Sequence, residues 1–281
     1  MVRIKAGSPH PNILVKYAYR LRFLFRELLS VNVEITDNDR RYRFTCENLR
    51  EYSRCVKMFI KEPGTCAWIK QYLTPGQVFY DIGANIGVYT VMAAFQTGTA
   101  GKVYAFEPHS GNFSRLLHNL QANNLMGIVH PLNIALNNAP GIFPFHHVDI
   151  GSGQSNSQLH ASANHPEMEQ PSVISEFKFA TSVDDLIESH RFDKPDHVKI
   201  DVDGNELLIL TGMKRLFGSA GEPETVQVEI HEGTEADIID FMKGFDYVPL
   251  QTHYTRSKIK SQHRGQNVKY PYNTVFGKAG S

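Results

Sequence analysis

The sequence lacks a charge excess, a large set of cysteines and long apolar runs. Lysine plus arginine and aspartate plus glutamate both number 29 in 281 residues, so overall charge does not indicate nucleic acid or an anionic membrane as a partner. The three cysteines, Cys46, Cys55 and Cys66, lack C-x-x-C spacing, which favours a reducing compartment over a disulfide framework. No apolar run approaches the roughly 20 residues of a membrane span, and no secretory signal is evident. We therefore expect a cytoplasmic protein.

From residue 77 onward, the chain alternates short apolar runs with helical patterns. Strands are expected at 78–82, 102–106, 128–134, 197–202, 225–231, 247–251 and 273–276, and helices at 86–95, 111–123, 183–189, 206–217 and 235–243. Strands separated by helices of this length imply right-handed crossovers, and hence a doubly wound, mostly parallel α/β sheet with helices on both faces. No helix separates the last two strands, so the sheet is predicted to have one antiparallel edge strand.

The length and the 41% of hydrophobic residues suit one domain with an extension. Residues 76–281 are expected to form the α/β domain, with polar excursions at 149–177 and 252–272. Residues 1–75 are expected to form an N-terminal extension of a helix, a short hairpin and further helices. Over 11–30, apolar residues fall on one helical face and basic residues on the other. We expect this basic amphipathic helix to dock on the domain, and an interfacial membrane anchor is the alternative.

The stretch "VFYDIGANIG", residues 78–87, ends a predicted strand near Asp81 and turns through Gly83 and Gly87. It is not the G-x-G-x-x-G loop that cradles the pyrophosphate of a dinucleotide. Asp81 places a carboxylate where a positively charged ligand can be held. Glu107, directly after the next strand, can accept hydrogen bonds from both ribose hydroxyls. S-adenosylmethionine fits both positions, because it has a ribose and two positive charges but no phosphate.

Four segments resemble the FkbM-type methyltransferases, a branch of the class I S-adenosylmethionine-dependent enzymes. They are "VFYDIGANIGVYTVMAA", "GKVYAFEPHSGNFSRLLHNL", "TSVDDLI" and "VKIDVDGNELLILTGM", and the resemblance covers roughly 78–231. It implies a seven-stranded Rossmann-like sheet and methyl transfer, commonly to a hydroxyl oxygen. It also implies a cofactor site formed by Asp81, Gly83, Ala84, Asn85, Gly87, Glu107 and Pro108. Asp203 departs from the family pattern, which usually has glutamate there.

Charged residues near the ends of two predicted central strands indicate where chemistry takes place. Lys199, Asp201 and Asp203 share one face of the strand "HVKIDVD", and Glu229 and His231 share one face of "TVQVEIH". Ligands of open α/β sheets bind beyond the carboxyl ends of the strands. His231 and Asp201 are therefore the candidates for the base that takes the acceptor's proton, and Glu229 is expected beside them. Asp203 is expected to contact the substrate.

Other interpretations of these charges stay open at this point. They can form a structural ion network around Lys199, and Glu206 can serve only to cap the following helix. The oxygen atoms of Asp201, Asp203 and Glu229 would also suit Mg²⁺. Because their spacing is not diagnostic of a metal ligand set, no metal is predicted.

The substrate is indicated by basic residues in the predicted 252–272 loop, among them Arg256 and Lys258. The loop leaves the sheet at the edge where the active site is expected. Its positive charge at that place predicts an anionic acceptor such as a phosphorylated or uronic sugar. Its few aromatic residues disfavour nucleic acid. The sequence thus predicts O-methylation of a hydroxyl on a small molecule or glycan. The alternatives are an NAD-dependent oxidoreductase, which the missing third glycine disfavours, and a non-catalytic cofactor-binding scaffold.

Overall fold

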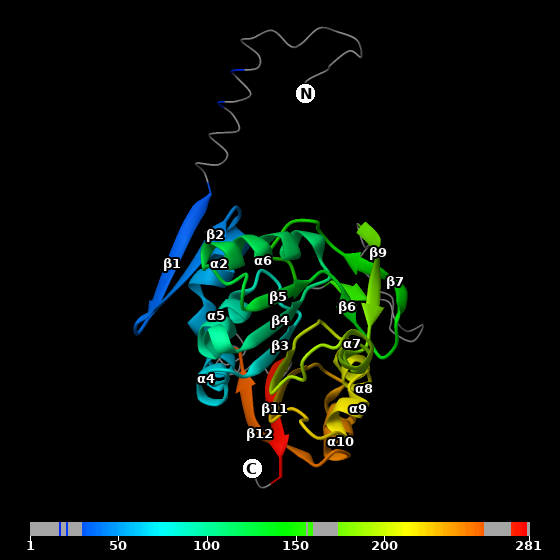
Figure 1. The fold of residues 1–281 in the computed structure, drawn as a ribbon. Helices are drawn as coiled ribbons and strands as arrows, with labels where there is room; N and C mark the ends of the chain where they lie inside the picture. Colours follow the sequence, from blue (N-terminus) through cyan, green and yellow to red (C-terminus); the bar gives the residue numbers. More distant parts are fainter. Residues whose placement is uncertain are drawn as a thin grey trace, which may run out of the picture.

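A computed structural model describes residues 17, 21, 30–155, 157–159, 174–255 and 271–279. At its centre is a seven-stranded sheet with the order β12-β13-β11-β10-β3-β4-β5 (Figure 1). The strands are β3 (Val78–Ile82), β4 (Lys102–Phe106), β5 (Val129–Leu132), β10 (His197–Ile200), β11 (Thr225–Ile230), β12 (Tyr247–Tyr254) and β13 (Tyr272–Lys278). All seven were predicted from the sequence pattern.

The strands β5, β4, β3, β10 and β11 pair in parallel, which confirms the mostly parallel sheet. The predicted antiparallel edge is confirmed, and within it β13 lies between β11 and β12 and pairs antiparallel with both. The edge strand is β12. Burial explains the order: nearly all of β13 is buried, as an inner strand requires, whereas most residues of β12 are partly or fully exposed.

Helices cover both faces of this sheet (Figure 1). One hydrophobic cluster joins the sheet to α4 (Pro63–Tyr72), α5 (Val88–Thr97) and α6 (Ser110–Ala122). The other joins it to α7 (Val183–His190), α8 (Glu206–Thr211), α9 (Lys214–Phe217) and α10 (Glu235–Lys243). Strand pleating separates the two, since the adjacent residues Phe79 and Tyr80 belong to opposite clusters. The single helix predicted over 206–217 is wrong, because it is interrupted at Gly212, where a Cβ would overlap the carbonyl oxygen of Asn137.

The segment before the sheet contains a hairpin of β1 (Val31–Asp37) and β2 (Arg40–Cys46), then α2 (Leu49–Val56) and α3 (Met58–Lys61). Tyr42 and Phe44 of β2 pack in the same cluster as α5 and α6. Most of the amphipathic helix predicted over 11–30 lies outside the described residues; of the three that are described, Tyr17 and Leu21 are helical and exposed, and Ser30 is not helical. Within the described part of the chain, no helix has the length and apolar character needed to cross a membrane.

A second, four-stranded sheet was not predicted. Its order is β6-β9-β7-β8, from β6 (Ala135–Leu136), β7 (Gly141–His147), β8 (Gln158–Leu159) and β9 (Ile174–Thr181). The polar excursion expected over 149–177 therefore contains β8 and the start of β9. The sequence pattern missed these strands because the buried cluster of this sheet is small, formed by Ala135, Phe145, Leu159 and Ala180.

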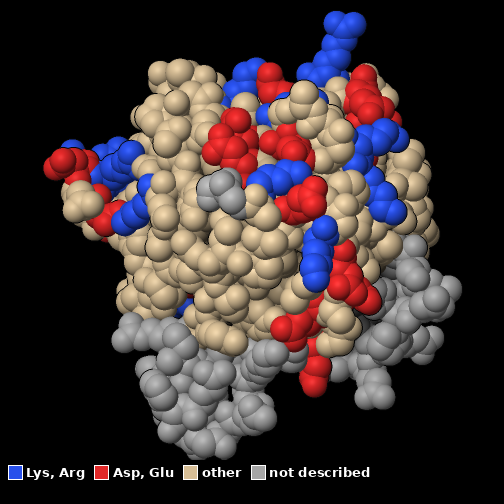
Figure 2. All heavy atoms as spheres, turned by 90° about the horizontal axis from the view of Figure 1, so that it is seen from below, with Lys and Arg blue, Asp and Glu red and all other residues tan. Residues whose placement is uncertain are grey.

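The charge balance of the sequence is visible on the surface. On the face shown in Figure 2, basic and acidic side chains are interspersed and are not gathered by sign. This face offers no extended patch of one charge among the described residues.

Candidate functional site

A cavity of about 300 Å³ lies at the carboxyl ends of β3, β4, β10 and β11. Seven predicted site residues line it: Gly83, Asn85, Glu107, Pro108, Asp201, Asp203 and Glu229. A smaller cavity of about 40 Å³ shares Gly83, Asn85 and Asp201 with the first and adds Ala84. The predicted residues Asp81, Gly87 and His231 are not among the lining residues of either cavity. Arg256 and Lys258 lie outside the described residues.

Asp81 is buried beneath the cavities and paired within the protein. Its Oδ2 accepts a hydrogen bond of 2.6 Å from the Thr90 hydroxyl, and its Oδ1 lies 3.4 Å from Nζ of Lys199. Lys199 also lies 3.2 Å from Oδ2 of Asp201. Burial tends to raise the pKa of Asp201, but the charges of Lys199 and Lys61 outweigh it and lower the pKa to about 2. The structure therefore contains the ion network around Lys199 that the sequence left open, and Asp201 belongs both to this network and to the lining of the cavities.

Gly83 brings the loop after β3 against the end of β10. Its φ is +80°, and a Cβ at this position would overlap the carbonyl oxygen of Asp201. Only glycine tolerates both conditions. Gly87 has a different place, since it forms the N-cap of α5 beside Leu116.

Glu107 joins two loops at the floor of the larger cavity. Its Oε2 accepts a hydrogen bond of 2.7 Å from the backbone N–H of Asn85, and its Oε1 accepts one of 2.8 Å from that of His109. Burial raises the pKa of Glu107 to about 7, although these two donors act in the opposite direction. The Asn85 amide also donates to the carbonyl oxygen of Gln154, and this bond draws the 151–155 loop to the cavity.

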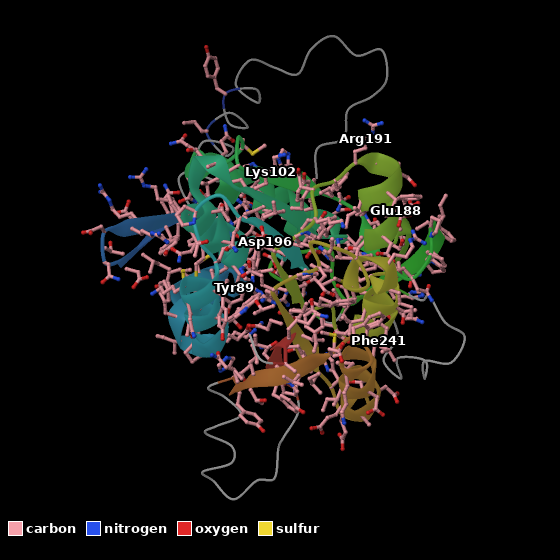
Figure 3. All side chains as sticks on the ribbon, turned by 60° about the horizontal axis from the view of Figure 1, so that its bottom comes forward. Tyr89, Lys102, Glu188, Arg191, Asp196 and Phe241 are labelled. Carbon is pink, nitrogen blue, oxygen red and sulfur yellow. The ribbon has the colours of Figure 1, made fainter. Side chains whose placement is uncertain are left out.

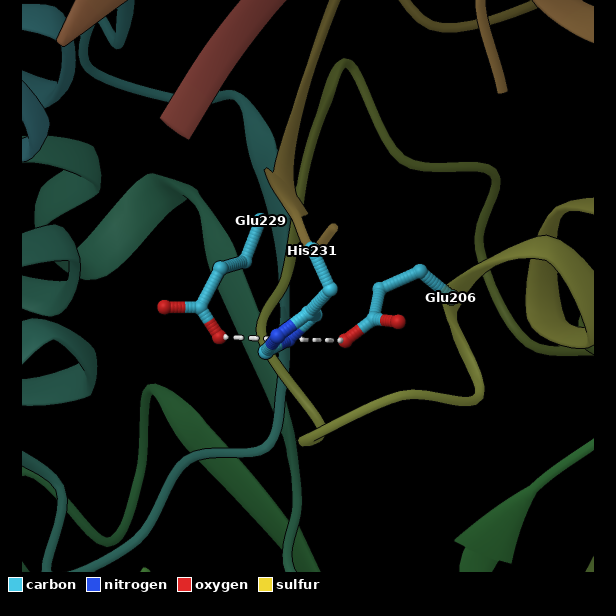
Figure 4. A group of neighbouring side chains, drawn as sticks. All are labelled: Glu206, Glu229 and His231. Carbon is cyan, nitrogen blue, oxygen red and sulfur yellow. Dashed lines mark ion pairs between the residues drawn. The ribbon is translucent and has the colours of Figure 1, made fainter. Parts of the chain in front are cut away.

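His231 lies between two carboxylates at the end of β11 (Figure 4). Its Nε2 is 3.1 Å from Oε2 of Glu229 and 3.4 Å from Oε1 of Glu206. These carboxylates, Glu206 first, raise the pKa of His231 to about 10. Burial, and then the charge of Asp201, raise the pKa of Glu229 to about 8. At neutral pH the imidazole is therefore a cation, and most of the Glu229 carboxyl is protonated.

Glu206 does more than begin a helix. It is the first residue of α8, and its Oε1 accepts hydrogen bonds from the backbone N–H groups of Gly204, at 3.0 Å, and Val202, at 3.4 Å. One ligand atom each from Glu206, Glu229 and His231 lie within 4.8 Å of one another. This group differs from the set of Asp201, Asp203 and Glu229 that was weighed from the sequence. The protonated imidazole already supplies a positive charge between its two carboxylates.

Sequence reasoning missed Arg54 of α2 and Lys61 of α3, which line both cavities. Nε of Arg54 donates to the carbonyl oxygen of Gly153, and its Nη2 donates to the Ser155 hydroxyl, both at 2.8 Å. Arg54 thereby holds the 151–155 loop over the site. No sequence pattern indicated these residues, because they precede every motif by more than a dozen positions and reach the cavity only through helix packing.

A family model matches the part of the sequence that forms most of this site. The methyltransferase FkbM domain matches residues 81–249. The chain belongs to this family. It is an S-adenosylmethionine-dependent methyltransferase, as the sequence predicted, and the oxidoreductase alternative is set aside.

Individual relatives of this methyltransferase are also known. The chain is 29% identical over 214 residues to the hexuronic acid methyltransferase AglP of Haloferax volcanii, which covers 76% of this chain and 80% of that protein. A crystal structure of methyltransferase FkbM from Methylobacillus flagellatus aligns with a TM-score of 0.47 and 16% identity, covering 72% of this chain and 43% of the other. An S-adenosylmethionine-dependent O-methyltransferase from Thermotoga maritima aligns with a TM-score of 0.44 and 11% identity, covering 89% and 78%.

Proposed function

We propose that the protein transfers a methyl group from S-adenosylmethionine to an oxygen atom of a glycan that contains a uronic acid. The observation that carries this proposal is the larger cavity, which is lined by Glu107, Asp201 and Glu229. The relative from Haloferax volcanii, a hexuronic acid methyltransferase, supports the acceptor class.

The residues around the cavity fit the cofactor. Gly83 keeps the loop free of a side chain that would displace Asp201, and Asn85, Glu107 and Pro108 line the adjoining wall. We assign Glu107 to the ribose hydroxyls, because a carboxylate can accept hydrogen bonds from both. When bound, S-adenosylmethionine supplies an electrophilic methyl group on a sulfonium sulfur.

Within the predicted catalytic group, we assign the base to Glu229. It lines the cavity, and a pKa of about 8 makes it a stronger base than an ordinary carboxylate while leaving part of it ionised at neutral pH. Asp201 is a weaker base because Lys199 stabilises its ionised form. His231 acts as a positioning residue, since its positive charge holds Glu229 in place. Glu229 thus takes the proton that a hydroxyl acceptor releases.

Positive charge at the cavity favours an anionic acceptor. Arg54 and Lys61 line it, and so do Thr255 and Pro271, which flank the stretch that contains Arg256 and Lys258. We keep the prediction that these two basic residues contact the substrate. A cytoplasmic location also stays a proposal, and the free thiols of all three cysteines support it.

A transfer assay tests this function. The protein is incubated with S-adenosylmethionine carrying a labelled methyl group and with oligosaccharides that contain a uronic acid. The matched control acceptors have the uronic carboxyl reduced to an alcohol. We expect label in the uronic acceptors and little in the reduced ones, and mass spectrometry then locates the methyl group. Equal labelling of both acceptors would contradict the anionic substrate class.

The variant Glu229→Gln tests whether the site is catalytic or only binds the cofactor, as a non-catalytic scaffold would. Under our proposal this variant binds S-adenosylhomocysteine like the parent in calorimetry, yet its turnover falls by about 100-fold or more, as expected when a general base is lost. A parent protein that binds the cofactor and labels no hydroxylated or anionic acceptor would favour the scaffold.

A further inference from the structure

The smaller cavity has a wall that the family match does not include. The match begins at residue 81, whereas α3 and the residue after it supply Met58, Lys61 and Glu62. The loop after β3 and the start of α5 also line this cavity, including Tyr89, which is labelled in Figure 3. Because both cavities share Gly83, Asn85 and Asp201, a ligand bound at Glu107 can extend from the larger cavity into the smaller one.

Glu62 carries an unpaired acceptor in this wall. Its side chain is 6% exposed, its Oε1 lies 2.8 Å from Nζ of Lys61, and its Oε2 is buried and accepts no hydrogen bond from the described residues. Burial, and then the charge of the nearby Glu62, raise the pKa of Tyr89 on the same cavity. A buried carboxylate oxygen without a donor costs free energy unless a ligand supplies that donor. The cavity is therefore prepared for a group that carries N–H donors and a positive charge.

Among the described residues that line the smaller cavity, Lys61 is the cation that remains for an anionic group. Arg54 uses its Nε and Nη2 to hold the 151–155 loop, and Lys199 lies within 3.4 Å of two carboxylates, those of Asp81 and Asp201. Lys61 has one close carboxylate, Glu62, and its side chain is half exposed. Adjacent residues of the chain thus present one positive and one negative group to the same small space.

We propose that Glu62 binds the ammonium group, and Lys61 the carboxylate, of the amino-acid end of the cofactor. This inference rests on the proposed function. The amino-acid end carries these two groups on a single carbon, which matches the adjacent, opposite charges of the wall. The segment before the family domain thereby completes the cofactor site, and Asp81 serves to hold Lys199 rather than the ligand.

Two nucleosides that differ at this end test the inference by calorimetry. S-adenosylhomocysteine has the amino-acid group, and 5′-methylthioadenosine lacks it. The parent should bind S-adenosylhomocysteine more tightly, and Glu62→Gln and Lys61→Met should each reduce that preference by about tenfold or more, because a hydrogen bond to a charged group is lost. Affinity for 5′-methylthioadenosine should stay unchanged, which also shows that the variants are folded.

The exposed residues Glu232 and Lys57 provide charge-matched controls, since neither lines either of these two cavities. Glu232→Gln and Lys57→Met should keep the parental preference. If the parent shows a preference and both Glu62→Gln and Lys61→Met retain it in full, the inference is overturned and the methyltransferase proposal stands. If the parent binds neither nucleoside, the proposed function fails and this inference fails with it.

Discussion

Lys199 and Asp81 lie directly opposite each other in the central sheet, paired by the register of β10 and β3. Both side chains are 1% exposed, and Nζ of Lys199 is 3.4 Å from Oδ1 of Asp81. Burial lowers the pKa of a lysine, but the carboxylates of Asp201 and Asp81 outweigh it and raise the pKa of Lys199. The middle of the sheet thus contains a compensated ion pair directly beneath the proposed cofactor site.

Removal of Lys199 should be strongly destabilising. Lys199→Met leaves the carboxylate of Asp81 buried without its counter-charge, which we expect to cost about 3 to 5 kcal/mol of unfolding free energy. The exposed pair of Lys102 and Asp193, 2.7 Å apart, provides the control, and Lys102→Met should cost about 1 kcal/mol or less. Urea unfolding of both variants measures the difference. Equal losses of unfolding free energy would show that the buried pair stabilises the protein no more than the exposed pair does.

Gly76 and Gly83 have similar φ angles and together distinguish the cost of a left-handed backbone from the cost of a close contact. Gly76 and Gly83 have φ of +92° and +80°, but only Gly83 faces another segment within 4 Å, the end of β10 at Asp201. Gly76→Ala should lose about 1 to 2 kcal/mol through the left-handed conformation alone. Gly83→Ala should lose more and should also weaken binding of S-adenosylhomocysteine. Comparable stability and undiminished binding in Gly83→Ala would mean that the loop can move away from β10.

The sequence predicted the sheet well because each of its strands is a compact apolar run. It also predicted that Asp201, Asp203 and Glu229 lie close together, because the carboxyl ends of neighbouring parallel strands meet, and all three line one cavity. It could not show that Asp81 would be neutralised, since the pairing with Lys199 depends on strand order. Nor could it find Lys61 or Glu62, which reach the site through helix packing. The protonation states of the site residues depend on the same contacts, so they could not be predicted from the sequence either.

The charge of His231 should appear in the pH profile of turnover. If Glu229 is the base, the parental rate rises with pH through about 8, because the ionised form accepts the proton. His231→Gln removes the cation 3.1 Å away and should move this midpoint upward by about 1 to 3 pH units, so turnover at neutral pH falls about tenfold or more. A rate that instead rises through about pH 10 in the parent, and loses this rise in His231→Gln, would return the role of base to the histidine.

Cofactor binding should depend on pH through Glu107. Burial raises its pKa to about 7, so the carboxyl is protonated below that pH and ionised above it. Only the ionised group can accept a hydrogen bond from each ribose hydroxyl and still accept those from Asn85 and His109. The dissociation constant of S-adenosylhomocysteine should therefore be about tenfold higher at pH 6 than at pH 8, since each pH unit below the pKa reduces the ionised fraction about tenfold.

Glu107→Gln isolates this effect from other groups that titrate in the same range, among them Glu229. The amide does not ionise, so binding should be weaker than in the parent at pH 8 and should change little between pH 6 and pH 8. Calorimetry at both pH values, in buffers of matched ionic strength, provides the four dissociation constants. A parent with equal affinity at pH 6 and pH 8, or a Gln variant that keeps the parental pH dependence, would show that Glu107 does not bind the ribose as a carboxylate.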